Sequence, residues 1–236
     1  MMVMKLTKCL LSAAAAAATV VGAVSSPAQA FSFGPGGIRF DRDTTVDFSF
    51  IESHGYFRQR FGVQEIGGAR TNLMWETTRS DNNSWANDWQ GTCGSALLNC
   101  NASFTFKAGK SYSLFLDAID DFGGTYVLGE AVKFFNAPEA ATVLADTSYR
   151  DYNRSPNSLL SRTAGTNNAN PFAAPVLIAF EDYGLRNNAS DDHVDYNDFM
   201  LTAQARATVP EPATLAGLGV VVGGFGFARR RRVHQA

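Results

Sequence analysis

The chain has 236 residues and a formal net charge of −2 at neutral pH; 45% of its residues are hydrophobic and 18% are charged. This length can bury the core of one ordinary domain. The charge balance excludes the basic excess that nucleic-acid-binding proteins carry, so we expect no nucleic-acid partner.

The first 30 residues have the three-part layout of a secretory signal peptide. Lys5 and Lys8 make the beginning positive, and residues 10–24 form an almost uninterrupted apolar run. Small residues at 28 and 30 then suit a signal peptidase. Because the apolar run is short for a membrane span, we predict a signal peptide over residues 1–30, cut after Ala30, in preference to an uncleaved anchor.

Several short segments after residue 30 alternate apolar and polar residues with a period of two, which is typical of half-buried strands. The first covers residues 44–52. Residues 102–119 predict a β-hairpin, with a turn near Gly109 between two alternating arms. Further short strands are expected at residues 124–135, 141–146, 174–182 and 195–207.

No long segment of this region has the 3.6-residue period of an amphipathic helix, and 18 phenylalanines suit a β core. Segments 76–92 and 150–175 are rich in Asn, Ser, Asp and Thr, so we expect long loops there. The pattern predicts a mainly β fold, namely a single antiparallel β-sandwich or jelly-roll-like domain.

Three tryptophans, Trp75, Trp85 and Trp89, lie within 15 residues of one another, among Asn and Asp side chains. Such rings could stack on sugars, which makes a carbohydrate-binding module, with an extracellular polysaccharide as partner, the alternative function. The competing interpretation is one or two core tryptophans beside a polar loop. Exposure of the rings distinguishes the two hypotheses.

Cys93 and Cys100 are the two cysteines that remain once Cys9 leaves with the signal peptide. An even pair in an exported protein favours a disulfide, here closing a small loop. The competing hypothesis is a nucleophilic thiol at Cys93, but no histidine lies nearby in the sequence. We predict the Cys93–Cys100 disulfide.

Six acidic residues and Asn197 gather between positions 181 and 198, separated by turn-forming residues. A strand, a polar loop and a second strand would bring both ends of this segment together and could hold Ca²⁺, which prefers many oxygen ligands on a flexible loop. The spacing is not that of an EF-hand. The alternatives are a solvated acidic loop whose side chains cap turns, and catalytic carboxylates. The candidate metal ligands are Glu181, Asp182, Asp192, Asp195, Asn197 and Asp198.

The same segment resembles the end of a bacterial domain of unknown function, number 4114. The likeness lies in Phe180-Glu181-Asp182, a polar gap, and Asp195-Tyr196-Asn197-Asp198-Phe199. It implies a secreted β-domain that binds calcium. This chain departs from the pattern by placing two residues, instead of one, between Asp192 and Asp195. Asp120 and Asp121 would add ligands if their strand ended nearby.

The last 28 residues combine three features. Val209 to Pro212 contain two prolines, which exclude regular helix and sheet. Residues 213–228 carry no charge, and a helix there would span about 24 Å, slightly less than the hydrocarbon layer of a membrane. The four arginines Arg229, Arg230, Arg231 and Arg232 would hold its end on the cytoplasmic side. We predict a short transmembrane helix at 213–228.

Pro210-Glu211-Pro212, a short apolar span and a basic cluster resemble the PEP-CTERM sorting signal of bacteria, also labelled "ice-binding protein C-terminal domain". The resemblance implies recognition by an exosortase-type membrane enzyme, cleavage near the Pro-Glu-Pro, and transient anchoring before release to the cell surface or extracellular matrix. The alternative is an ordinary anchor that is never cut. We do not expect ice binding, because the chain has no regular threonine array.

These segments define three parts: a signal peptide (1–30), an exported β-sandwich (31–208) and a sorting signal (209–236). Of the 20 basic residues, two lie in the first part and four in the last; of the 22 acidic residues, one lies in the last. The exported part therefore has 14 basic and 21 acidic residues, a net charge of about −7.

Catalytic motifs are absent from the sequence: it has no G-x-S-x-G, no H-E-x-x-H and no phosphate-binding glycine loop. We therefore expect a non-enzymatic cell-surface or matrix protein with a structural calcium ion. Signal peptidase and the exosortase-type enzyme are its expected partners. A secreted glycosidase is the remaining enzymatic alternative, because carboxylate pairs are abundant.

Overall fold

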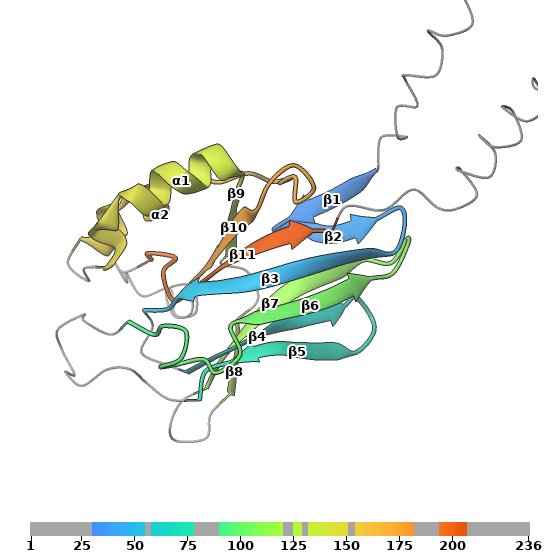
Figure 1. The fold of residues 1–236 in the computed structure, drawn as a ribbon, viewed down its shortest axis with the longest axis horizontal. Helices are drawn as coiled ribbons and strands as arrows, with labels where there is room; N and C mark the ends of the chain where they lie inside the picture. The colour runs from blue at the N-terminus through green and yellow to red at the C-terminus, as the bar shows by residue number, and fades with distance from the viewer. Residues whose placement is uncertain are drawn as a thin grey trace, which may run out of the picture. The chain divides into compact units, whose positions relative to one another are not determined.

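The structure is a computed structural model that describes residues 30–54, 58–77, 90–119, 125–128, 132–150, 154–181 and 194–206. It is built mainly of antiparallel strands in two sheets (Figure 1), which confirms that the fold is mainly β and antiparallel. Among the described residues, the strands and both clusters of buried hydrophobic residues lie between residues 31 and 205.

Sheet A has the strand order β1-β2-β7-β4-β5, and β8 also pairs with β7. Its longest pairing joins β4 and β7, where Phe61 lies opposite Leu116. The strands are β1 (Phe31–Gly34), β2 (Gly37–Phe40), β4 (Arg58–Glu65), β5 (Arg70–Trp75), β7 (Tyr112–Ile119) and β8 (Thr125–Leu128).

Sheet B has the strand order β6-β3-β11-β10-β9. β3 alternates strictly between buried and half-buried residues, as predicted for this segment. β10 is buried along its whole length because both of its faces are covered. The strands are β3 (Thr44–Glu52), β6 (Asn101–Phe106), β9 (Val132–Phe135), β10 (Val176–Phe180) and β11 (Phe199–Ala205).

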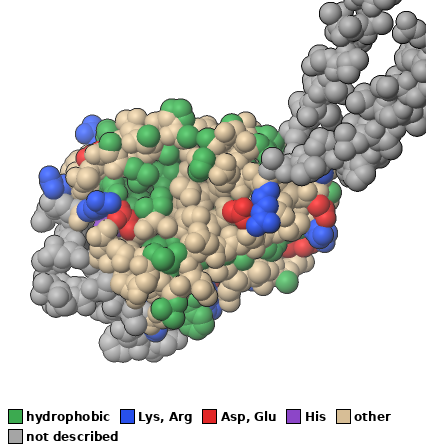
Figure 2. All heavy atoms as spheres, in the orientation of Figure 1, with side chains coloured by type: hydrophobic (Ala, Val, Ile, Leu, Met, Phe, Trp, Pro, Cys, Tyr) green, Lys and Arg blue, Asp and Glu red, His purple; other side chains and the backbone are tan. Residues whose placement is uncertain are grey.

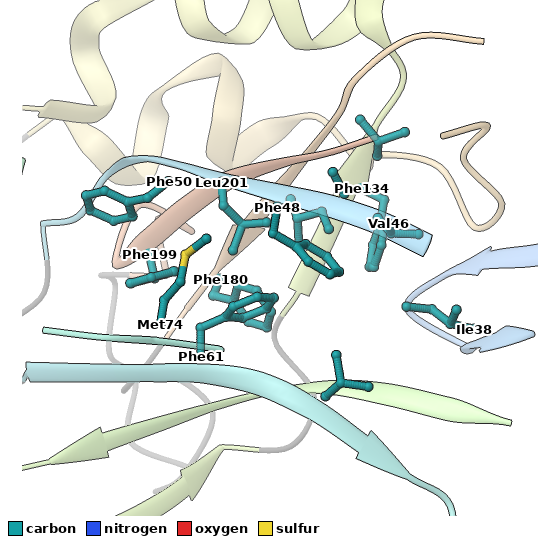
Figure 3. Close-up of a cluster of buried hydrophobic side chains, with 14 of the residues drawn as sticks. Ile38, Val46, Phe48, Phe50, Phe61, Met74, Phe134, Phe180, Phe199 and Leu201 are labelled. Carbon is teal, nitrogen blue, oxygen red and sulfur yellow. The ribbon is translucent and has the colours of Figure 1, made fainter. Parts of the chain in front are cut away.

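Aromatic side chains from the two sheets form the core. Figure 3 shows Phe48 and Phe199 of sheet B directed toward Phe61 of sheet A. The ring centroid of Phe61 lies 5.3 Å from that of Phe48 and 6.0 Å from that of Phe199. Burying such large rings is the main stabilising contribution in a sandwich of this size.

A helical layer covers the outer face of sheet B beside β9 and β10 (Figure 1). Tyr149 and Leu160 of this layer pack with Leu177 and Met200 in a second buried cluster. The prediction of a strand at residues 141–146 is therefore wrong. Six residues were too few to reveal the helical period. The layer consists of α1 (Ala137–Ala145), η1 (Thr147–Arg150), η2 (Ser155–Asn157) and α2 (Leu159–Arg162).

The predicted hairpin over residues 102–119 is also wrong. The turn exists, with Gly109 at a φ of +72°, but β6 pairs with β3 in sheet B whereas β7 pairs with β4 in sheet A. The link therefore crosses between the sheets, and the rings of Phe106 and Tyr112 meet in the core at 5.1 Å. Both arrangements need the same alternation, so the local pattern does not distinguish them.

Similarly, the segment 124–135, predicted as one strand region, contributes β8 to sheet A and β9 to sheet B. The predicted loop 150–175 contains η2 and the short α2. Within the described residues, no helix is long and apolar enough to cross a membrane. The predicted signal peptide up to residue 29 and the predicted span 213–228 both lie outside them.

Candidate metal centre

The ends of two neighbouring strands bring three acidic residues together. Glu181 directly follows β10, and Asp198 directly precedes β11. These strands are antiparallel, with Phe180 opposite Phe199, so residues just after one lie beside residues just before the other. The Asp198 N–H donates a hydrogen bond to the Phe180 carbonyl at 3.1 Å, which extends this pairing.

Glu181, Asp195 and Asp198 form what we call the acidic triad. Each offers a carboxylate oxygen, and these oxygens all lie within 4.8 Å of one another. The residues are only 4%, 8% and 7% exposed, respectively. Carboxylate oxygens gathered this closely at a buried position are the kind of ligand set that a hard cation binds.

Backbone hydrogen bonds place one side chain of the triad. The N–H groups of Asp195 and Tyr196 both donate to Glu181 Oε2, at 2.8 and 3.1 Å. Tyr196 has a positive φ of 58°, a conformation uncommon for a residue with a side chain. The strained backbone and the two donors together hold the Glu181 carboxylate against this turn.

The titration of Asp195 reflects its surroundings. Burial, reinforced by the negative charge of Glu181, raises the pKa of Asp195 to about 7. The hydrogen bond that its Oδ2 accepts from Ser155 Oγ at 2.6 Å opposes this shift. At neutral pH the free site is therefore poised between a protonated and an ionised Asp195, and a bound cation would favour the ionised form.

Lys133 of β9 lies near the triad but is held by other groups. Its Nζ donates to the carbonyls of Leu160 and Ser161, and it lies 3.9 Å from the centroid of the Tyr196 ring. Burial lowers the pKa of Lys133 to about 8, although the charge of Glu181 acts in the opposite direction. Lys133 is thus fixed by neutral partners and interacts with Glu181 through its charge.

The other predicted ligands have different positions. Asn197 is buried, and its Nδ2 donates to the Tyr149 carbonyl, so this amide ties the turn to η1. Asp182 and Asp192 lie outside the described residues, as do Asp120 and Asp121.

A second buried carboxylate, Glu52 at the end of β3, was missed by the sequence analysis. It accepts hydrogen bonds from Tyr149 Oη at 2.6 Å, from Arg150 Nε at 2.9 Å and from Gln90 Nε2. Burial raises its pKa, but the neighbouring His54, whose Nε2 lies 3.7 Å from Glu52 Oε1, and the hydrogen bonds from Tyr149 and Arg150 outweigh this effect and lower the pKa to about 2. The sequence did contain a signal for this site: in the alternating segment 44–52, Glu52 takes a position that faces inward.

Glu76, just after β5, is a further buried carboxylate that was not predicted from the sequence. It accepts hydrogen bonds from Ser53 Oγ and, at 2.7 Å, from the Gln59 N–H. Burial nevertheless raises the pKa of Glu76 to about 7. These contacts join the end of β3 in sheet B to β4 in sheet A.

The predicted disulfide is confirmed: Cys93 and Cys100 are bonded, with their Cα atoms 5.7 Å apart. The interpretation of Cys93 as a nucleophile is therefore wrong, because its sulfur is in the bridge. Trp75 is 52% exposed, which excludes it from the core. Trp85 and Trp89 lie outside the described residues.

The comparison with protein families identifies the tail. Residues 208–232 match the PEP-CTERM protein-sorting motif, which confirms the resemblance found in the sequence. The motif contains Pro210, Glu211 and Pro212 and implies an exported, cell-envelope-associated protein that an exosortase recognises in the membrane. No curated protein and no solved structure matches the chain.

Proposed function

We propose that this chain is a non-enzymatic protein of the bacterial cell surface or extracellular matrix, whose β-sandwich is stabilised by a calcium ion at the acidic triad. The observation that supports the calcium site most directly is the burial of Glu181, Asp195 and Asp198 with their oxygens within 4.8 Å. The sorting motif supports the location.

Calcium suits this site better than a softer metal. The triad offers only carboxylate oxygens, the ligands that hard cations prefer, and Ca²⁺ tolerates the irregular geometry of a turn. Calcium takes six to eight oxygens, so the triad would supply part of its coordination. Asp182, Asp192 and Asn197 remain predicted ligands for the rest.

In this proposal the ion has a structural role. It would join the end of β10 to the turn before β11, and Ser155 and Tyr149 connect that turn to the helical layer. A ligand that binds only the folded state stabilises it by mass action. The ion would therefore hold the helical layer on sheet B.

The sorting pathway completes the proposal. The signal peptide would be removed after Ala30, and the C-terminal segment would hold the protein in the membrane until an exosortase-type enzyme cuts near Pro210-Glu211-Pro212. The released part would then begin at Phe31 and carry the whole core.

The first experiment is a thermal melt of residues 31–208 in Ca²⁺ and in EDTA. We expect an upward shift of several degrees in Ca²⁺, and a much smaller shift in Mg²⁺ at the same concentration. Asp198→Asn should lose the shift. Asp43→Asn is the matched control, because Asp43 is an exposed carboxylate paired with Lys107 far from the triad in sequence. Equal melting temperatures in Ca²⁺ and EDTA would refute the site.

A further inference from the structure

The outer face of sheet A carries a group of aromatic and charged side chains that the calcium proposal does not use. We call it the arginine–tryptophan face; it consists of Arg60, Arg70, Trp75, Phe115 and Asp117, from β4, β5 and β7. The helical layer contacts β9 and β10 of sheet B. The two faces of the sandwich thus differ in character.

The β-sheet register places three of these residues in one row. Arg60 lies directly opposite Trp75 on one side and Asp117 on the other. The Arg60 guanidinium stacks on the Trp75 ring, 4.6 Å from its centroid. About half of the Trp75 surface remains exposed, which is unusual for so large an apolar ring.

Arg70 of β5 contacts two other residues of the same face. Its guanidinium lies 4.6 Å from the centroid of the Phe115 ring, and its Nη1 is 3.2 Å from Asp117 Oδ1. The Phe115 ring in turn lies on Gly62, where an added Cβ would be only 2.5 Å from the ring. The face is therefore a packed surface built on three paired strands.

Among the described residues, Arg60 lacks the carboxylate partner that several other surface cations have. Lys107, Lys110 and Arg206 each pair with a carboxylate, at 2.5 to 2.7 Å. Figure 2 shows adjacent basic and acidic side chains of this kind on the face in view. Within the described part of the chain, Arg60 has no such partner, and its Nε is buried without a hydrogen bond.

We propose that the arginine–tryptophan face binds an acidic polysaccharide that contains uronic acid sugars. The exposed indole would stack on the apolar face of one sugar ring. The Arg60 guanidinium beside it would pair with a carboxylate, for which its planar fork of donors is suited. A row of strand residues that includes an exposed indole suits an extended polymer better than a small molecule, which would need a concave pocket.

Charge explains why the polymer would bind at this face. The exported part has 14 basic and 21 acidic residues, so most of it repels an anionic polymer. An arginine that lacks a carboxylate partner within the described ranges and lies beside an exposed indole would set the position of the polymer on this surface. None of the residues of the arginine–tryptophan face belongs to the acidic triad. Polysaccharide binding at this face therefore does not depend on calcium binding at the triad.

The test is affinity electrophoresis of the full chain in a nonionic detergent that contains no sugar. Native gels would contain polygalacturonate or, as the neutral polymer, dextran, with EDTA present so that calcium bridges nothing. We expect retardation by polygalacturonate that weakens as salt increases, and none by dextran. Arg60→Gln should weaken apparent binding about tenfold, the loss expected for one charge-assisted contact. Trp75→Ala should weaken it about as much, because the stacking surface for the sugar ring is lost.

Two controls keep the result interpretable. Arg206→Gln removes an exposed arginine that is paired with Asp47, and it should bind like the wild type. Arg60→Lys keeps the charge without the fork and should bind with intermediate strength. Melting curves would confirm that each variant folds. Equal retardation by dextran, no retardation at all, or an equal loss in Arg206→Gln would each overturn the proposal.

Discussion

The backbone N–H of Asp195 donates a hydrogen bond to Glu181 Oε2 at 2.8 Å, across 14 positions of sequence. The same contact that orients Glu181 brings the Asp195 carboxylate beside it. The negative charge of Glu181 then raises the pKa of Asp195 further, after burial. One turn thus both builds the acidic triad and raises the pKa of one of its members.

Asp195→Asn should therefore have opposite effects with and without calcium. In EDTA at pH 8 the variant should be more stable by a few kcal/mol, because a buried charge is removed while an oxygen remains for Ser155. In Ca²⁺ it should lose the stabilisation seen in the wild type. Urea unfolding at both conditions measures the two effects. A variant that is less stable in EDTA would contradict the interpretation of the triad.

Glu76 should make stability depend on pH in a defined window. Its pKa is about 7 in the folded protein and 4.5 without the fold, so the folded state retains a proton that the unfolded state releases. Stability should accordingly fall as pH rises from about 4.5 to 7, by about 3 kcal/mol in total. Glu76→Gln should remove this slope, because glutamine does not titrate. The amide can keep both contacts, since it can accept from the Gln59 N–H and donate to Ser53 Oγ.

The measurement is urea unfolding at a series of pH values in Ca²⁺, so that Asp195 contributes little. Below pH 4.5, Glu52 acts in the opposite sense. Its folded pKa is lowered to about 2, so stability is lost as pH falls from about 4.5 toward 2. Glu76→Gln should leave this acid limb unchanged. If the variant kept the slope between pH 4.5 and 7, Glu76 would not be its source.

Removing the disulfide should destabilise the exported part. The bridge closes a loop with a sequence separation of 7, and the chain-entropy model gives about 2.5 kcal/mol for such a loop. The double variant Cys93→Ala, Cys100→Ala measures this loss in urea without leaving a free thiol. Mass spectrometry of the non-reduced wild type should find no free cysteine in residues 31–208, and two free thiols there would disprove the bridge.

The sorting motif predicts a change in size and location. Pro210→Ala combined with Glu211→Ala should leave a longer, membrane-associated product in the native host, because the site that the exosortase recognises is altered. Immunoblots of membrane and medium fractions compare it with the wild type. Glu139→Ala, a change in α1 far from the motif in sequence, is the control. Identical products from both would favour a plain anchor.

Features that depend on neighbouring residues were predictable from the sequence. Alternation in residues 44–52 predicted β3 because a strand places successive side chains on opposite faces. The pairing of Cys93 with Cys100 followed from the short spacing of two cysteines in an exported part. The sorting motif was recognisable because an enzyme reads it as a linear segment.

Some expectations failed because two structures satisfy the same local pattern. Strands β6 and β7 alternate as hairpin arms would, yet they pair in different sheets, and only the fit of Phe106 and Tyr112 in the core distinguishes the cases. Helix α1 begins after Asn136 with a proline in its first turn. Its apolar residues were mistaken for a strand because the helix buries only Ala140 and Val143.

By itself, the sequence determined the β class of the body, the covalent loop between Cys93 and Cys100, and the sorting tail, because each depends on residues close together in the chain. Only the tertiary structure decided which carboxylates share a site. Glu181, Asp195 and Asp198 meet because β10 and β11 pair, and Glu52 meets Tyr149 across 97 positions. Segments distant in the sequence bury these carboxylates only once the sheets and the helical layer have packed together. The pKa shifts that follow from burial therefore cannot be derived from neighbouring residues alone.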